Sequence, residues 1–234
     1  MPNLLGATPQ SDREDFARLW REGGVNPDEM KIYPCQLLRN AELYQYWERG
    51  EYRPYEEQEL IDLLADIKPT VPRFCRINRV IRDIPSNHVV EGNRNTSLRQ
   101  DVDQEMKKRG SSCQCIRCRE IRKGKIDDRN LVLDDQVYKA DWAEEHFLSY
   151  NTQDDNILGF LRMSLPSANH FFPVEDLQDA AIIREVHVYD PPALKGGPGA
   201  DAHHVEGLCG SPRALHPADG GVVEDKQIPC DLAA

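Results

Sequence analysis

Three cysteines within six residues, Cys113, Cys115 and Cys118, carry the sharpest chemical signal in the chain. Cys-x-x-Cys spacing lets two sulfurs face one tetrahedral ion, and thiolates favour soft ions, of which zinc is the first choice. The surrounding stretch is polar, so these side chains have no apolar core to join, which is the usual role of a single cysteine. Neighbouring positive charge would lower the pKa of the thiols, and it comes from Arg117, Arg119 and Arg122. We therefore predict a zinc site, with an inert reduced cluster as the alternative.

The sequence does not identify a fourth ligand for this site. His88 is the nearest histidine, but a lone histidine is more often a surface or core residue than a ligand. The chain has seven cysteines and no signal-peptide pattern at its start. Free thiols or metal ligands are therefore expected instead of a disulfide framework, and the expected location is the cytoplasm.

Arginines recur every third residue in the apolar stretch 74–84, at Arg76, Arg79 and Arg82. Side chains alternate between the faces of a strand, so Arg76 and Arg82 would share one face and Arg79 would take the other. Guanidinium groups suit phosphate oxygens. The alternative is that these arginines pair with carboxylates at the edge of a sheet.

Charge is distributed unevenly along the chain. The formal net charge is −11, yet residues 71–126 hold fourteen lysines and arginines against six acidic residues. This basic middle includes a second cationic run, Lys107, Lys108 and Arg109. Such asymmetry is typical of a phosphate-binding strip, although charges that merely solvate helix faces would give the same count. No apolar run approaches the ~20 residues that cross a bilayer.

Periodicity predicts an α/β fold. Helices are expected from Ser11, in a capping box with Glu14, to the glycines at 23 and 24, and over 40–50, 56–67 and 96–109. Short strands are expected at 30–33 and 74–84, so the first 85 residues would form βα units with a mostly parallel sheet. Strands at 144–150, 157–162 and 182–189 would form an antiparallel meander, with a domain boundary near residue 125. Beyond Pro191 no period persists, and no structure is predicted there.

Eight motifs in one order resemble the family of the Elongator catalytic subunit, the tRNA wobble-uridine carboxymethyl synthase, in its bacterial or archaeal form. The resemblance covers roughly residues 1–190 and rests on these motifs: Pro2-Asn3-Leu4, Leu19-Trp20, Lys31-Ile32-Tyr33-Pro34, Leu43-Tyr44-x-x-Trp47, Arg79-x-x-Arg82-Asp83-Ile84-Pro85, Cys115-Ile116-Arg117-Cys118-Arg119-Glu120, Phe147-Leu148-Ser149-Tyr150 and Arg184-Glu185-Val186-His187-Val188-Tyr189.

The resemblance implies a radical S-adenosylmethionine barrel followed by a GNAT acetyltransferase, both acting on the wobble uridine of tRNA. Residues 1–85 would be the C-terminal part of the barrel, 86–125 a basic linker with the metal-binding cysteines, and 126–190 the opening strands of the acetyltransferase. Residues 191–234 would be an aberrant or disordered tail. The phosphate strip would then bind tRNA, and the pantetheine arm of acetyl-CoA would lie along Glu185, Val186, His187 and Val188.

Two departures from the family pattern predict an inactive piece of a larger enzyme. The early cysteine triad that holds a [4Fe-4S] cluster and S-adenosylmethionine is absent, and the three cysteines at 113–118 come too late to replace it. The turn that binds the pyrophosphate of acetyl-CoA at a helix N-terminus has only a blurred counterpart at 202–210. Two other readings stay open: a non-catalytic, zinc-containing RNA-binding module, and a free-standing acetyltransferase. The oligomeric state, including self-association, is not specified by the sequence.

Overall fold

The computed structural model describes the chain except for residues 22, 83, 123–129, 168–176, 178–179 and 190–234. The expected tail therefore lies outside the described residues. Residues 1–192 form one compact unit. No helix in the described ranges is long and apolar enough to span a membrane.

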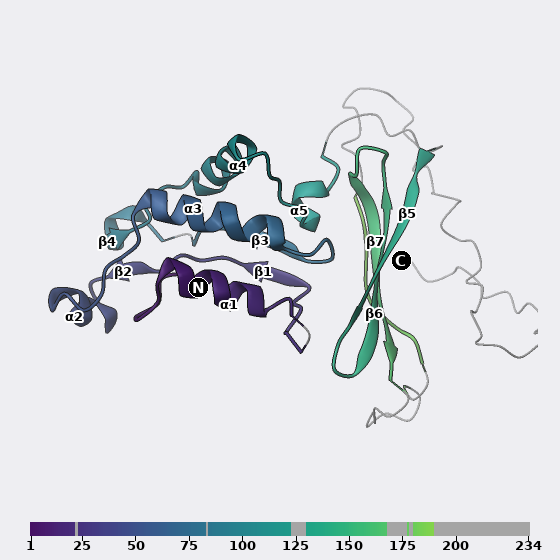
Figure 1. Ribbon diagram of the computed structural model, residues 1–234, viewed down its shortest axis with the longest axis horizontal. Helices are drawn as coiled ribbons and strands as arrows, with labels where there is room; N and C mark the ends of the chain where they lie inside the picture. Colours follow the sequence, from purple (N-terminus) through teal and green to yellow (C-terminus); the bar gives the residue numbers. More distant parts are fainter. Residues whose placement is uncertain (22, 83, 123–129, 168–176, 178–179, 190–234) are drawn as a thin grey trace, which may run out of the picture. The chain divides into compact units, whose positions relative to one another are not determined.

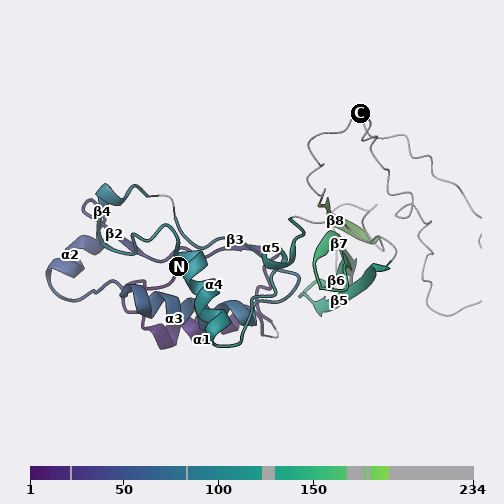
Figure 2. The ribbon, with the colours of Figure 1, turned by 90° about the horizontal axis from the view of Figure 1, so that it is seen from above.

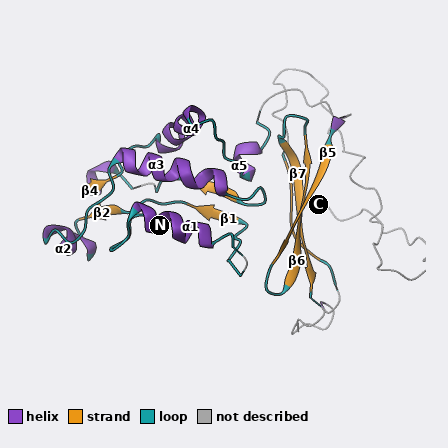
Figure 3. Cartoon of the chain, in the orientation of Figure 1, coloured by secondary structure: helices purple, strands orange, loops and turns teal. Residues whose placement is uncertain are grey.

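Helices dominate the chain up to residue 119, and the four longest strands follow (Figure 3). The first part runs in the order α1 (Pro9–Arg18), β1 (Glu29–Lys31), β2 (Gln36–Leu38), α2 (Leu43–Glu48), α3 (Glu57–Ile67), η1 (Lys68–Thr70), β3 (Arg76–Arg79), η2 (Ser86–His88), β4 (Val89–Gly92), α4 (Leu98–Lys108) and α5 (Ile116–Arg119). The second part contains β5 (Val132–Lys139), β6 (Ala143–Asn151), β7 (Ile157–Pro166) and β8 (Ile182–Val188).

Helix α3 forms because its apolar residues recur at helical spacing and its first turn is capped. Leu60, Leu63, Leu64 and Ile67 are buried, and they form one face of the helix. The Glu59 carboxylate accepts a hydrogen bond from the backbone N–H of Glu56, 2.8 Å away, as in a capping box. The helix contacts both α1 and α4 (Figures 1 and 2).

The expected α/β class is confirmed, whereas the expected mostly parallel sheet is only half right. Strands β1 and β3 pair in parallel, but β2 and β4 form a separate antiparallel pair. The two strands expected over the first 85 residues correspond to β1 and β3. Strands β2 and β4 are three and four residues long, too short for their periodicity to be distinguished from loop.

Two expected element boundaries were wrong. Helix α1 starts at Pro9, because Thr8 is extended and its hydroxyl accepts the Ser11 N–H at 3.1 Å, so the capping box uses Thr8 and Ser11. Strand β3 ends at Arg79, not at residue 84. Its partner β1 is only three residues long, so no backbone lies beside the chain beyond that point, and Arg82 does not share a strand face with Arg76.

The antiparallel meander expected after residue 125 is present as a four-stranded sheet in the order β5-β6-β7-β8. The β6–β7 ladder pairs Phe147 with Arg162 and Leu148 with Leu161. Strand β5 was missed by the sequence analysis. One hydrophobic core joins the residues of α3, α4 and α5 to Phe147, Ile157 and Phe160 of this sheet.

Candidate metal centre and the adjoining pocket

The three cysteines at 113–118 come together at the start of α5. Cys115 is the N-cap of α5, Cys118 lies within the helix, and the backbone N–H of Cys118 donates to the Cys115 carbonyl at 3.0 Å. The Ile116 N–H donates to the carbonyl of Cys75, also at 3.0 Å, and this bond ties the turn to the segment that enters β3. Ile116 is completely buried. Local backbone bonds and one apolar anchor thus fix the turn that carries the cysteines.

The three sulfur atoms lie within 4.8 Å of one another. Zinc–thiolate bonds of about 2.3 Å in a tetrahedron place sulfurs about 3.8 Å apart, so a small contraction would seat one ion. Cys113 and Cys115 are buried, whereas Cys118 is exposed. Among the described residues no other histidine, cysteine or carboxylate joins this group, and His88 is not part of it. The donor set fits zinc with one coordination position left for a ligand from outside the group.

Hydrogen bonds within the cluster polarise the three thiols. Bonds from Cys113 and Cys118 lower the pKa of Cys115 to about 2. The same contact with Cys115 raises the pKa of Cys113. The arginines expected to lower the thiol pKa values are not among the main causes of these shifts, because mutual thiol contacts dominate at this range.

Two further buried groups accompany the cluster, and the sequence gave no sign of either. Cys75 is completely buried, and burial raises its pKa to about 12, so it remains a thiol. Lys68 is also completely buried and donates from Nζ to Asp103 Oδ1. Its positive charge acts on the pKa of Cys118 in the same direction as the hydrogen bond from Cys113, which lowers it, against the contact with Cys115 and burial, which raise it.

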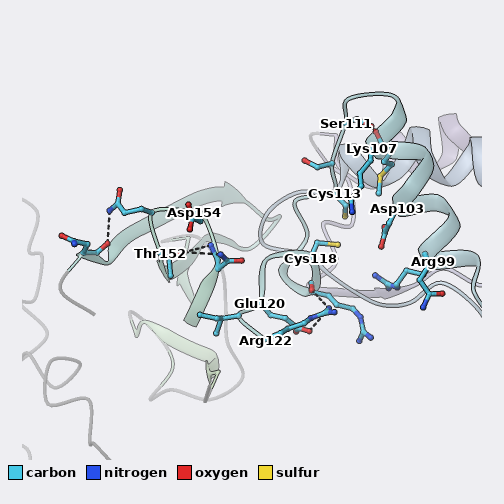
Figure 4. A pocket seen from close by; sticks show the side chains of 18 residues that line it. Arg99, Asp103, Lys107, Ser111, Cys113, Cys118, Glu120, Arg122, Thr152 and Asp154 are labelled. Atoms are coloured by element: carbon cyan, nitrogen blue, oxygen red, sulfur yellow. Dashed lines mark hydrogen bonds and ion pairs between the residues drawn. The ribbon is translucent and has the colours of Figure 1, made fainter. Parts of the chain in front are cut away.

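A cavity of about 1170 Å³ opens beside the cysteines, between α4, α5 and the turn that joins β6 to β7 (Figure 4). Cys113 and Cys118 contribute to its lining. Its cationic residues are Arg99, Lys107, Arg117 and Arg122. The metal candidate and the densest group of cations therefore share one cavity.

The structure divides the residues of the predicted phosphate strip. Lys107 lines the cavity. Arg76 is engaged elsewhere, with its Nη1 bound to Glu120 at 2.7 Å and to the Tyr189 hydroxyl at 2.8 Å. Arg79 and Arg82 are exposed at and beyond the end of β3.

The cationic run that ends α4 is held mainly by acidic neighbours. Arg109 pairs with Glu105, Asp62 and Asp66, and Lys108 pairs with Glu105 at 3.2 Å. Carboxylate pairing, the alternative considered for the arginines of the strand, thus holds for Arg76 and also for Arg109.

The predicted acetyl-CoA strand is β8, which pairs with β7 alone among the described strands. Val186 and Val188 are exposed, and His187 stacks on Phe160 with ring centroids 5.6 Å apart. The Glu185 carboxylate accepts from Arg162 Nε at 2.8 Å. In the described part, one backbone edge of β8 is unpaired, as a pantetheine-binding strand requires.

Two ion networks that the sequence analysis missed join the sheet to the preceding part. Arg162, almost completely buried, donates to Asp28 at 3.1 Å, and Arg184 pairs with the same carboxylate. On the other network, Asp155 in the β6–β7 turn accepts from Arg73 at 2.6 Å and from Arg119 at 3.3 Å. These partners are 82 or more residues apart for Arg73 and Arg162, so spacing in the sequence gives no signal for them.

Comparison with known proteins agrees with this organisation. The Radical_SAM C-terminal domain family matches residues 27–108. The tRNA uridine(34) acetyltransferase of Methanocaldococcus jannaschii is 34% identical over 195 residues, which cover 80% of this chain and 36% of the relative. The enzyme of the same name from Dehalococcoides mccartyi is 35% identical and covers 89% of this chain and 46% of the relative.

Elongator complex protein 3 of Saccharomyces cerevisiae is 36% identical over 197 residues, 81% of this chain and 35% of the relative. The solved structure of the archaeal Methanocaldococcus infernus Elp3 with an N-terminal deletion superposes with a TM-score of 0.74 at 33% identity, and covers 80% of this chain and 45% of that one. The chain thus spans between a third and half of the length of these relatives. It belongs to the family of the Elongator catalytic subunit, of which it represents a part.

Proposed function

We propose that this chain is part of a tRNA-modifying acyltransferase that acts on the wobble uridine of tRNA. The observation that carries the proposal is one continuous similarity, at 34–36% identity, to proteins named tRNA uridine(34) acetyltransferase and Elongator complex protein 3. It covers 80% or more of the chain. The match is therefore not confined to one widespread module.

Within this proposal the basic residues hold the RNA and the cysteines hold zinc. A structural zinc contributes folding free energy, and here it would fix the turn from which Arg117 projects. Strand β8 offers backbone groups to the pantetheine arm of acetyl-CoA, the acyl donor in the proposed reaction. The counterpart of the pyrophosphate turn, at 202–210, lies outside the described residues.

The residues of this chain do not fit a radical S-adenosylmethionine cluster. Cys113, Cys115 and Cys118 follow the stretch that matches the Radical_SAM C-terminal domain, whereas the family's cluster-binding cysteines belong near the start of the barrel. In our proposal the [4Fe-4S] cluster and S-adenosylmethionine belong to parts of the full-length enzyme other than those present in this chain, and we assign no step through them to these residues.

Segment exchange tests the proposed function. Residues 1–190 would replace the matching segment of the Dehalococcoides mccartyi relative, and nucleosides from tRNA treated with the hybrid would be analysed by mass spectrometry. We expect modified wobble uridine from the hybrid and none from a hybrid with Glu185→Pro, which removes a β8 backbone donor. A hybrid that folds, binds tRNA and leaves uridine unmodified would contradict the proposal.

A second candidate is a non-catalytic, zinc-containing RNA-binding module. The placement of the cysteines and four cations around one cavity favours it. Tight tRNA binding by this chain, together with failure of the hybrid to modify uridine, would support this function over the first.

A further inference from the structure

The cavity beside the cysteines is lined by cations that converge from two elements. Arg99, Asp103, Met106 and Lys107 lie on one face of α4, at the i, i+4, i+7 and i+8 positions of a helix. Arg117 comes from α5. The opposite wall is the turn between β6 and β7, where Thr152 and Asp154 lie (Figure 4). The fold thus gathers positive side chains that are up to 18 residues apart in the sequence, as the numbering of Arg99 and Arg117 shows.

The acidic residues of the cavity leave part of this positive charge uncompensated. Glu120 is shared between Arg76, at 2.7 Å, and Arg122, at 3.1 Å. Asp103 accepts from the buried Lys68. Asp154 is exposed on the far side of the cavity from Arg99 (Figure 4).

Arg99 and Arg117 are the cations for which the cavity supplies no carboxylate. Arg99 donates to the backbone carbonyl of Ile77 at 2.8 Å, and Arg117 makes no ion pair with any residue that the structure describes. Arg117 Nε is buried and has no hydrogen-bond partner within the described part. Burial, and then the charge of Arg99, lower the pKa of Arg117. An unsatisfied buried donor on a charged group is costly, so a ligand that accepts from it would be favoured.

The shape and lining of the cavity indicate the class of anion. A single phosphate ion would leave most of about 1170 Å³ unfilled, since pockets of 300–1,000 Å³ hold drug-sized ligands. Hydroxyl and amide side chains line the rest, from Ser111, Ser112, Thr152, Gln153 and Asn156. Such groups bind ribose and base edges, whereas guanidinium groups bind phosphate.

We propose that this cavity binds a backbone phosphate of RNA together with an adjoining nucleoside, and that Arg99 and Arg117 are the phosphate contacts. The proposal rests on the proposed function, because it makes the RNA of that reaction the ligand. It differs from the strip predicted from the sequence, in which neither Arg99 nor Arg117 was included. The cavity also places the phosphate beside Cys118, so the metal turn would position an RNA contact as well as stabilise the fold.

Substitution of the two arginines tests this assignment. Binding of the whole chain to a short RNA hairpin with uridine in its loop would be followed by fluorescence anisotropy over a range of salt concentrations. Arg99→Gln and Arg117→Gln should each weaken binding about tenfold at low salt and reduce the slope of log K against log salt by about one. Arg117→Lys, which keeps the charge, should retain most of the slope.

Arg18→Gln is the matched control, since Arg18 is exposed, lies on α1 and pairs with Asp15. It changes the net charge equally and should leave both affinity and slope unchanged. Zinc content and melting temperature of each variant would establish that the fold is retained.

The possible outcomes separate the two proposals. If the wild-type chain binds the hairpin and Arg99→Gln and Arg117→Gln bind equally well, the cavity assignment is wrong while the proposed function stands. Absence of RNA binding by the wild-type chain would overturn both. Inorganic phosphate that binds as tightly as the hairpin would show a free-anion site and would also overturn the assignment.

Discussion

Lys68 is a residue whose role depends on where its charge lies. Its side chain is 0% exposed while its partner Asp103 is 40% exposed. The two ends of this ion pair are therefore not equivalent, because a lone buried ammonium cannot be solvated, whereas a lone Asp103 carboxylate can.

This asymmetry predicts opposite consequences for two substitutions. Asp103→Ala should lower the free energy of unfolding by about 3 kcal/mol, since it leaves the Lys68 charge buried without its carboxylate. Lys68→Met, similar in volume and apolar, should cost about 1 kcal/mol or less. Urea denaturation of both variants would measure the difference. Equal losses would mean that the pair acts through packing and not through charge.

The cysteine turn predicts about one zinc per chain. Cys115→Ser should remove the metal, because Cys115 is the buried N-cap of α5 and one of only three sulfurs in the described group. It should also loosen the segment around α5, which hydrogen exchange would detect. Cys75→Ser is a useful comparison, since Cys75 is buried outside the group and its replacement should leave the zinc content unchanged. Metal-free protein after purification without chelator would exclude the site.

At the scale of single residues, spacing revealed the cysteine cluster but not its surroundings. Three cysteines within one turn are brought together by local backbone geometry, so their proximity can be read from the sequence. Lys68, Arg119 and Arg162 could not be recognised as buried, because charged residues are usually exposed. Their partners come from distant segments, which periodicity does not report.

Among the elements, α3 carries a feature that depends on pH. Glu59 accepts from Arg53 at 2.7 and 2.9 Å and from the Glu56 N–H, and the contact with Arg53, followed by that with Glu56, lowers its pKa from 4.5 to about 2. A carboxylate whose pKa is lowered in the folded state stabilises the fold above its unfolded pKa. That contribution is lost as the pH falls from 4.5 toward 2.

Glu59→Gln should therefore cost about 0.5–1 kcal/mol at pH 7, a modest value because Arg53 is largely exposed. The difference between variant and wild type should shrink below pH 4.5. Urea titrations at pH 7, 4.5 and 3.5 would follow it. A difference that is the same at all three values would show that the capping geometry, not the charge, is what matters.

Elements with strong periodicity were predicted well, and short ones were not. The amphipathic helix α3 and strands β6, β7 and β8 lie where apolar spacing places them. Strand β5 escaped because its burial alternates weakly, with Val132, Leu133 and Val137 exposed. Strand β3 was overextended because the length of a strand depends on its partner, and β1 is separated from it by more than 40 residues.

For the whole molecule, we expect no binding of acetyl-CoA below millimolar concentrations. Strand β8 provides backbone contacts for the pantetheine arm, but residues 202–210 lack the glycine spacing of a pyrophosphate turn. Loss of several charge-assisted bonds, each worth about 1.5–3 kcal/mol, should leave only weak affinity. Calorimetry that gives micromolar affinity would mean that the C-terminal residues form a working site, and the chain would then be expected to turn over acetyl-CoA itself.

Binding of tRNA as a function of salt tests the central claim most directly. If this chain is the RNA-binding part of a wobble-uridine enzyme, its affinity for tRNA should fall steeply between 50 and 200 mM salt, by about 10³-fold or more for about six phosphate contacts. Charge reversal of Arg79 and Arg82 together should weaken it further, and a DNA duplex of equal length should bind less tightly. Affinity for tRNA that does not change with salt or with these substitutions would contradict the account.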